Sequence, residues 1–358
     1  MAFANPRLAD IATATGKSIQ TVGIVMNGGK GNTGVSDATR QRIRKAAERL
    51  GYRTNPLAQA VRQGRTGSLG MLIATDSHRS YLPADLFFGL VTQADRNGYD
   101  IKLAHYTDAQ LSREREMPRV FREIMGDGLL VNYFDNSAMV APLRRGLCRH
   151  HIPAIWLNRD MPEDGVCFDD HGAGVELTQM MLADGLRRIA YVDLECAPNA
   201  HYSRRARPAG YADAMREAGL EPDVTLRSVA RPRHLATLRE WLRRRPRLDA
   251  IIGYSMENVA PPLIQLATAA NRRFGDDLRF GFFGSPDELF MFPHYVMVQQ
   301  NRAYGEAAVH MLIEKIRQPD MTLATQRIPF EGVGPTGSSA RSGAKLRKAD
   351  TRTHEKRT

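Results

Sequence analysis

The spacing that carries chemical information lies near the start of the chain, in residues 8–27. Apolar residues recur there at helical spacing as far as a glycine: Leu8, Ile11, Ala12 and Gly16. A second apolar run follows a hydroxyl: Ser18, Val22, Val25 and Met26. Two short helices, broken at a glycine and with a serine able to cap the second, are typical of a helix-turn-helix, whose chemistry is nucleic-acid recognition. An ordinary helical hairpin is the alternative.

The charge distribution favours the helix-turn-helix. Residues 1–66 hold 11 Lys and Arg against 3 Asp and Glu, and residues 339–358 hold 7 against 2. The whole chain carries +11, so the 272 residues between these ends sum to −2. A basic excess concentrated on a helix-turn-helix indicates a polyanion as partner.

Catalytic, metal and cofactor sites are not expected. No Ser-His-Asp or Cys-His arrangement stands out, and the glycine motif at 29–34 follows a helix, whereas a dinucleotide fingerprint follows a strand. Cys148, His150 and His151 lack a second ligand pair at metal-binding spacing. The three cysteines of the chain form no CxxC motif and are odd in number, which predicts reduced thiols in a cytoplasmic protein.

The elements that must position the first two helices begin with a third. Ser36 can cap this helix, Ile43, Ala46 and Ala47 mark its apolar face, and Gly51 ends it. A short segment over 55–64, with a proline near its start and a glycine at its end, predicts a brief helix. We expect a headpiece over residues 1–53 and a hinge helix and linker over 54–67.

From residue 68 onward the pattern alternates between strand and helix. The expected strands cover 69–75, 101–105, 128–133, 152–157, 188–194, 248–254 and 278–284. The expected helices cover 83–97, 112–125, 136–149, 171–184, 208–218, 233–244, 257–270 and 302–316. The first of these helices should turn a set of apolar residues inward: Leu86, Phe87, Leu90, Val91 and Ala94. Apolar strands joined by helices predict parallel sheets covered on both faces, arranged as two lobes with a ligand cleft between them.

This core should cover residues 68–335, and the basic tail over 336–358 should be disordered. No stretch approaches 18 apolar residues without charge, so no membrane span is expected. The N-terminus lacks the apolar region of a secretion signal, which predicts a cytoplasmic protein.

The chain resembles the LacI-type (LacI/GalR) family of bacterial transcriptional regulators over residues 7 to about 330. The headpiece motifs are Asp10-Ile-Ala12, Ser18-x-x-Thr21-Val22, Asn27, Val35-Ser36-x-x-Thr39-Arg40 and Ala46-Ala-Glu-x-Leu-Gly-Tyr52. The hinge and core motifs are Asn55-x-x-Ala58, Asp127-Gly128-Leu, Ile152-Pro153, Arg207-x-x-Gly210-Tyr211 and Gln299-x5-Gly305. The resemblance implies an N-terminal all-α helix-turn-helix headpiece and an α/β two-lobed core like the periplasmic binding proteins.

The resemblance also implies which residues meet DNA. The second helix should lie in the major groove with Ile19, Gln20 and Ile24 facing the bases. Gln20 can bond adenine through two hydrogen bonds, and the isoleucines can only make apolar contacts. Relatives usually carry an arginine or another polar residue at the position of Ile24, so we expect no guanine recognition there. Alternatively, Ile24 packs against the third helix.

Further DNA contacts are implied outside the base-reading face. Ser18, Thr21 and Asn27 match family positions that bind phosphates. In the hinge, Asn55 and Ala58 match the family motif, and Val61 stands where the family inserts a leucine between base pairs of the minor groove. Valine is shorter and β-branched, which predicts a weaker wedge.

The effector site is implied by the same resemblance. Arg207 matches the arginine that bonds ligand hydroxyls or carboxylates, although a surface salt bridge is the alternative. Tyr81 and Ser255 are the other candidates for effector contact. Gly284 replaces an expected aspartate, which favours an acidic or more apolar effector, or none. The carboxylate pair Asp169-Asp170 is assigned a structural role.

We therefore expect a sequence-specific DNA-binding regulator that represses transcription and that is controlled by a small molecule bound between the lobes. Its partners should be a pseudo-palindromic double-stranded operator, a small-molecule effector and a second copy of the chain. A homodimer follows because a short hinge helix needs its two-fold mate, and Leu86, Phe87 and Leu90 are the candidate interface residues. The rival hypotheses are the same DNA-binding protein without an effector, a cytoplasmic solute-binding protein, and a sugar enzyme.

Overall fold

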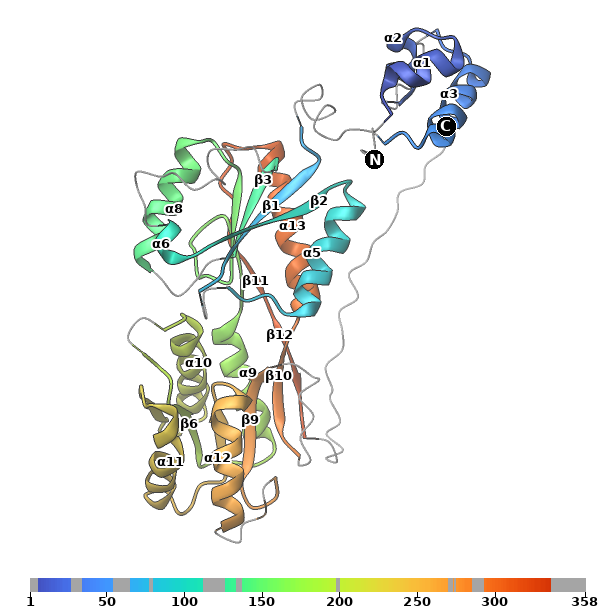
Figure 1. Cartoon of the computed structure of the whole chain (residues 1–358). Coiled ribbons are helices and arrows are strands. Elements are labelled where there is room, and N and C mark those ends of the chain that lie inside the picture. Colours follow the sequence, from blue (N-terminus) through green and yellow to red (C-terminus); the bar gives the residue numbers. More distant parts are fainter. Residues whose placement is uncertain are drawn as a thin grey trace, which may run out of the picture.

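The structure is a computed structural model of the chain (Figure 1). It describes residues 6–26, 34–53, 65–76, 80–111, 126–132, 137–197, 200–269, 273, 275–284 and 293–335. Three predictions lie outside the described residues: the hinge helix over 55–64, the helix over 112–125 and the disordered tail over 336–358.

The headpiece consists of α1 (Leu8–Thr15), α2 (Ile19–Met26) and α3 (Asp37–Leu50). α1 ends at Gly16 in the left-handed conformation, with φ 62°, where a residue without a Cβ atom is favoured. The Ser18 hydroxyl accepts a hydrogen bond from the Thr21 amide at 3.1 Å, which satisfies one free amide at the start of α2. The three predicted helices and their predicted breaks are thus confirmed.

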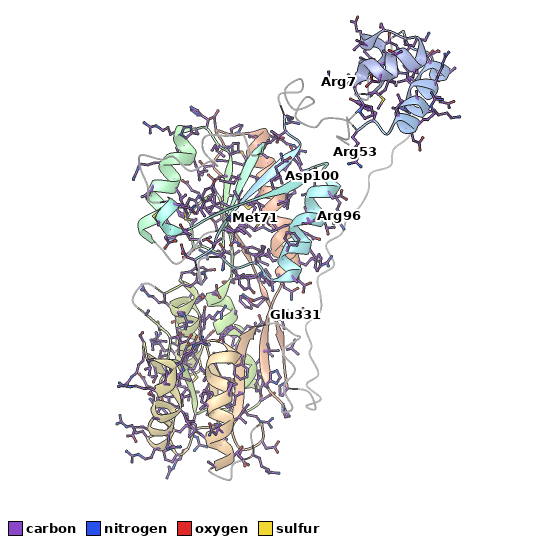
Figure 2. All side chains as sticks on the ribbon, viewed as in Figure 1. Arg7, Arg53, Met71, Arg96, Asp100 and Glu331 are labelled. Carbon is purple, nitrogen blue, oxygen red and sulfur yellow. The ribbon has the colours of Figure 1, made fainter. Side chains whose placement is uncertain are left out.

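The first lobe, which we call the N-lobe, is built on a fully parallel six-stranded sheet. Its strands are β1 (Ser68–Ala74), β2 (Asp100–Tyr106), β3 (Gly128–Asn132), β4 (Ala154–Leu157), β5 (Gly165–Phe168) and β11 (Gln326–Ile328), in the order β11-β5-β4-β3-β1-β2. Its helices are α5 (Ala84–Arg96), α6 (Asp108–Leu111), α8 (Ser137–Arg149) and α13 (Asn301–Arg317). In Figure 2 Met71 of β1 lies inside this lobe, and it is fully buried.

The second lobe, the C-lobe, repeats this architecture with one antiparallel strand at an edge. Its strands are β6 (Ile189–Asp193), β7 (Asp223–Leu226), β8 (Ala250–Gly253), β9 (Arg279–Gly284), β10 (Tyr295–Gln299) and β12 (Phe330–Val333), in the order β12-β10-β9-β8-β6-β7. Its helices are α9 (Asp170–Ala183), α10 (Ser203–Glu217), the 3-10 turn η1 (Arg231–Arg233), α11 (His234–Arg243) and α12 (Met256–Ala269). The predicted two-lobed α/β fold is confirmed.

The chain passes between the lobes three times, as Figure 1 shows. It leaves the N-lobe sheet after β5, returns after β10, and crosses again between β11 and β12. Aromatic rings pack the crossings together. The ring centre of Phe168 lies 4.7 Å from that of Tyr304, on which it stacks, and 5.3 Å from that of Phe330. Three connections that share an apolar cluster therefore join the two lobes.

Glycines set a close helix crossing in each lobe. In the N-lobe, a Cβ atom on Gly89 of α5 would lie 2.3 Å from the Arg302 carbonyl oxygen of α13. In the C-lobe, a Cβ atom on Gly174 of α9 would lie 2.2 Å from the Arg207 carbonyl oxygen of α10. Side chains at these positions would force the helices apart, so both lobes depend on glycine for the packing of their inner helix pair.

Two sequence predictions about α5 are wrong. Val91 is 39% exposed and does not face the core. Leu86 and Leu90 are 1% and 0% exposed within the lobe, so they cannot supply a dimer interface as predicted. The apolar residues that α5 does expose are Phe88, at 53%, and Val91. The apolar run continues around the helix, and its periodicity therefore did not separate the inner face from the outer one.

Candidate functional site: the headpiece and the junction of the lobes

The exposed face of α2 carries the predicted base-reading residues. Val22 and Val25 are buried against the other two helices, which turns the opposite face outward. On that face Ile19 is 56% exposed and Gln20 is exposed. Ile24 is half-buried and does not belong to the apolar cluster of the headpiece. The first turn of α2 thus presents one amide and one apolar side chain to a partner.

Hydroxyl groups lie at the start of this helix, and cationic groups lie on the third helix of the headpiece. Ser18 Oγ and Thr21 Oγ1 lie 2.8 Å apart, so the cap holds both hydroxyls at the start of the helix. The outer side of α3 is strongly basic, with four exposed cations: Arg42, Arg44, Lys45 and Arg49. Hydroxyls at a helix start and cations on a neighbouring helix can both contact phosphates and set the register of a bound duplex. The predicted DNA contacts Asn27, Asn55, Ala58 and Val61 lie outside the described residues.

The second group of polar residues lies where the carboxyl ends of the strands in both sheets meet. Tyr81, predicted as an effector contact, connects the two lobes at this edge. Its hydroxyl donates to Gln299 Oε1 at 2.7 Å, at the point where β10 leaves the C-lobe. Its carbonyl oxygen accepts from Asn132 Nδ2, at the end of β3, at 2.8 Å. Tyr81 therefore couples a strand end of the N-lobe to one of the crossings.

Arg207, the predicted effector arginine, forms an internal ion pair. Its Nε donates to Asp170 Oδ1 at 2.7 Å and its Nη1 donates to the Tyr254 carbonyl oxygen at 3.0 Å. The side chain is 6% exposed, so the pair is buried and not the surface salt bridge of the alternative prediction. Burial lowers the pKa of Arg207, but the Asp170 carboxylate together with Tyr254 and Tyr191 raises it above its usual value.

Aromatic rings surround the Arg207 guanidinium. Its central carbon lies 4.6 Å from the ring centre of Tyr254 and 4.5 Å from that of Phe283. A second arginine, Arg204, lies 4.0 Å from the Tyr254 ring centre, so this tyrosine contacts both guanidinium groups. Arg204 Nη1 donates to both carboxylate oxygens of the buried Asp193, at 2.6 and 2.7 Å. Each cation at the junction thus has its own carboxylate.

His201 links the lobes directly. Its Nε2 lies 2.8 Å from the Asn158 carbonyl oxygen, which follows β4 of the N-lobe, and its Nδ1 lies 2.7 Å from Ser203 Oγ. Ser203 Oγ in turn lies 2.8 Å from the Tyr254 hydroxyl. Burial lowers the pKa of His201 to about 4, so the imidazole is neutral at physiological pH. This chain joins the N-lobe to the tyrosine beside Arg207.

Ser255, the third predicted effector contact, immediately follows Tyr254. Its Oγ is buried and makes no hydrogen bond to any residue that the structure describes. A buried hydroxyl without a partner is uncommon in folded proteins and marks a position where a polar ligand atom would be satisfied. Arg207 donates to the Tyr254 carbonyl oxygen and Ser255 follows Tyr254 in the chain, whereas Tyr81 belongs to the neighbouring crossing.

Sequence reasoning missed several members of this network. Asp170 was assigned a structural role, and Asp193, His201, Arg204 and Tyr254 were not selected. One signal was available, because Asp170 begins α9 and Arg207 lies near the start of the neighbouring helix α10 of the same lobe. Which carboxylate meets which arginine depends on the helix crossing at Gly174, and no local pattern encodes that crossing.

The described residues contain no group of three His, Cys, Asp or Glu side chains that could hold a metal ion. Within the same part of the chain, no helix is long and apolar enough to span a membrane. The chemistry that the junction does offer is hydrogen bonding and ring stacking around two neutralised arginines.

Comparisons with known proteins agree with this geometry. Residues 7–55 match the model of the bacterial regulatory proteins of the lacI family. Residues 66–329 match the model of the periplasmic binding proteins and sugar binding domain of the LacI family.

Similar proteins include the HTH-type transcriptional regulator CelR of Thermobifida fusca, which is 25% identical over 329 residues, or 87% of this chain and 92% of that one. The HTH-type transcriptional regulator PtxS of Pseudomonas plecoglossicida is 32% identical over 234 residues, or 64% of this chain and 65% of that one. Among solved structures, the lac repressor dimer bound to operator and the anti-inducer ONPF has a TM-score of 0.72 at 17% identity, covering 93% of this chain and 98% of that one. The last similarity establishes the fold.

Proposed function

The chain belongs to the lacI family of bacterial regulatory proteins, and we propose that it is a dimeric repressor whose affinity for a pseudo-palindromic operator is controlled by a small molecule bound between the lobes. The observation that carries the DNA-binding part is the outward face of α2, where Gln20 and Ile19 are exposed on a basic three-helix headpiece. Ser18, Thr21 and Asn27 contact phosphates in this proposal, and Asn55, Ala58 and Val61 contact the minor groove.

The proposed readout of each half-site follows from the chemistry of α2. Gln20 bonds an adenine through N6 and N7, and Ile19 contacts a thymine methyl. Ile24, half-buried and apolar, offers no hydrogen bond to guanine. We therefore expect half-sites that are poor in guanine at the positions below the middle of α2.

The operator can be found by selecting bound fragments from random duplex DNA at moderate salt. Enrichment of a pseudo-palindrome would support a dimer that reads two half-sites. Uniform recovery without a motif would contradict the proposal, because it would leave only salt-sensitive binding to phosphates.

For the effector we propose an uncharged ligand rich in hydroxyl groups. Arg207 and Arg204 are each neutralised by a buried carboxylate, so an acidic ligand would have to displace Asp170 or Asp193. The buried Ser255 hydroxyl, which has no partner among the described residues, favours a ligand that exchanges hydrogen bonds without bringing charge. These observations support a neutral sugar more than the acidic or more apolar effector that the loss of an aspartate at Gly284 suggested.

A thermal-shift screen of sugars, sugar acids and sugar phosphates tests this assignment. We expect a shift with a neutral sugar and a smaller shift in Ser255→Ala, with the unfolding temperature of the free variant unchanged. A shift produced only by acids would overturn the ligand class. The absence of any shift would favour the rival hypothesis of a regulator without an effector.

The dimer surface that we propose lies on α5 and β2 and consists of exposed apolar residues. Phe88 and Val91 of α5 are 53% and 39% exposed, and Leu103 of the edge strand β2 is 46% exposed. These residues replace the buried Leu86 and Leu90 of the sequence-based prediction.

The relatives are transcriptional regulators, which disfavours the solute-binding and enzymatic alternatives. We propose that the protein acts in the cytoplasm, associated with the nucleoid when it is bound to its operator.

A further inference from the structure

The net charge of the core is close to zero because a strongly positive segment is offset by negative charge elsewhere in it. Residues 223–249 hold eight arginines against three carboxylates, a net charge of +5. The remainder of residues 67–338 holds 24 Lys and Arg against 31 Asp and Glu, a net charge of −7. Positive charge is thus concentrated in 27 residues of the C-lobe.

These residues form one outer surface, which we call the arginine face. The segment runs through β7, η1 and α11 to the turn before β8. α11 buries His234, Leu238 and Trp241 against the lobe, and Leu235 and Leu242 pack against the same core, so the arginines of the helix lie on its exposed side. The exposed arginines are Arg227, Arg231, Arg233, Arg239, Arg243, Arg244 and Arg247.

Each of the three carboxylates of the segment already forms an ion pair with an arginine. Asp223 accepts from Arg245 at 2.6 and 2.7 Å, and Asp249 accepts from Arg188. Glu240 accepts from two arginines of its own helix, and these hydrogen bonds lower its pKa to about 2. The carboxylates of this segment therefore leave most of the positive charge uncompensated.

Four cations of the arginine face have no ion pair or side-chain hydrogen bond with a described residue: Arg227, Arg233, Arg239 and Arg247. A planar guanidinium offers paired donors that match two oxygens of a phosphate. Several such groups on one outer surface suit a ligand that repeats phosphate along its length.

The topology decides which nucleic acid this surface would meet. The linker enters the N-lobe at the amino end of β1, and the C-lobe joins the N-lobe at the carboxyl ends of β1 and β3, where Tyr81 bonds Gln299. In Figure 1 α11 lies at the far end of the core from the start of β1. The duplex held by the headpieces is therefore not the duplex that reaches α11.

We propose that the arginine face binds the phosphate backbone of a second DNA segment, without sequence preference, while the headpieces hold the operator. A regulator bound to its operator is surrounded by other segments of the same chromosome at a high effective concentration, so weak contacts suffice to bind a second segment. Such a contact would let one dimer bridge two stretches of duplex. This inference rests on the DNA-binding function proposed above.

A two-duplex capture experiment with the full-length protein tests the inference. Protein is loaded on an immobilised duplex that carries the selected palindrome, so both headpieces are occupied, and a labelled random-sequence duplex is then added. The test variant combines Arg233→Gln, Arg239→Gln and Arg247→Gln, which removes three unpaired charges and leaves every ion pair of the face intact. The matched control combines Arg145→Gln, Arg149→Gln and Arg317→Gln, three exposed arginines of the N-lobe.

We expect the wild type and the N-lobe control to capture the second duplex and the test variant to capture at least tenfold less. If each of the three arginines neutralises one phosphate, a fourfold rise in salt should weaken capture about 40-fold more in the wild type than in the test variant. Equal capture by the test variant and the wild type would overturn the proposal, as would capture by none of the proteins. Retention on the immobilised duplex is read first, so a failure of operator binding is recognised separately.

Discussion

At the scale of single residues, the main charged feature at the junction of the lobes is a buried ion pair. Arg207 is 6% exposed and Asp170 is 2% exposed, and the two are joined at 2.7 Å. Taking both charges out of water is costly, and the pair is stable only because each member also has hydrogen bonds or aromatic contacts. The resemblance identified the arginine as important, but the identity of its partner emerges only from the fold.

Removing one member of this pair should destabilise the core strongly. Asp170→Ala leaves the Arg207 guanidinium buried without its carboxylate, and we expect a loss of about 3–5 kcal/mol in the free energy of unfolding. Asp170→Asn keeps an acceptor oxygen of similar size and should lose less. Urea unfolding followed by circular dichroism measures both variants. A loss below about 1 kcal/mol in Asp170→Ala would show that the pair is not buried as described.

His201 should make the stability of the core depend on pH. Its pKa in the folded protein is about 4, below the usual value of 6.5, so the unfolded chain binds the extra proton first. Stability is then fully present above the unfolded value and is lost as the pH falls from 6.5 towards 4. Between pH 7.5 and pH 5.0 the wild type should lose about 2 kcal/mol more than His201→Gln in urea unfolding. Parallel losses in the two proteins would contradict the assignment.

At the scale of elements, the helices with marked ends were predictable. Gly16 and Gly51 end α1 and α3 with positive φ, and Ser18 and Ser36 cap the helices that follow them. The strands missed were β5, β7, β10, β11 and β12, which have three to five residues each. Segments this short gain strand structure from their neighbours in the sheet and have too few residues to show a period. α10 also begins at Ser203, five residues before its predicted start, because Pro208 lies inside the helix.

The same scale yields a prediction about the helix crossings. Gly174→Ala would place a Cβ atom 2.2 Å from the Arg207 carbonyl oxygen, and Gly305→Ala would place one 2.5 Å from that of Leu86. Both lobes must shift their helices to accept the methyl group, and we expect each variant to lose about 1–3 kcal/mol in thermal or urea unfolding. Gly334→Ala, whose Cβ atom meets nothing closer than 4.0 Å, serves as the control. Unchanged stability in Gly174→Ala would refute the close crossing.

At the scale of the whole molecule, sequence reasoning reached the fold and the function class but not the surfaces. The alternation of strands and helices predicted two lobes, and the family motifs predicted the headpiece. The total charge of the core concealed the arginine face, because +5 in one segment is offset by −7 elsewhere. Which side of α5 is exposed was likewise decided by Gly89 packing on α13, which draws Leu86 and Leu90 inward.

The assembly should depend on the exposed side of α5. Phe88→Glu places a charge in the proposed dimer surface, and we expect at least a tenfold weaker dimer, because a buried unpaired charge costs several kcal/mol. Sedimentation at a series of concentrations measures the dissociation constant. Gln179→Glu, at an exposed position of α9 in the C-lobe, adds the same single negative charge outside the proposed surface and is the control. A dimer of unchanged strength in Phe88→Glu would move the interface elsewhere.

The most direct test of the central claim repeats the random-duplex selection with the wild type and Gln20→Ala side by side. The account predicts a pseudo-palindrome for the wild type and, for the variant, the loss of base preference at one symmetric position in each half-site, worth about 1–3 kcal/mol. The other positions should stay as they are, because Ser18 and Thr21 still fix the helix on the phosphates. An identical motif for both proteins, or no motif for either, would contradict the claim that α2 reads the operator.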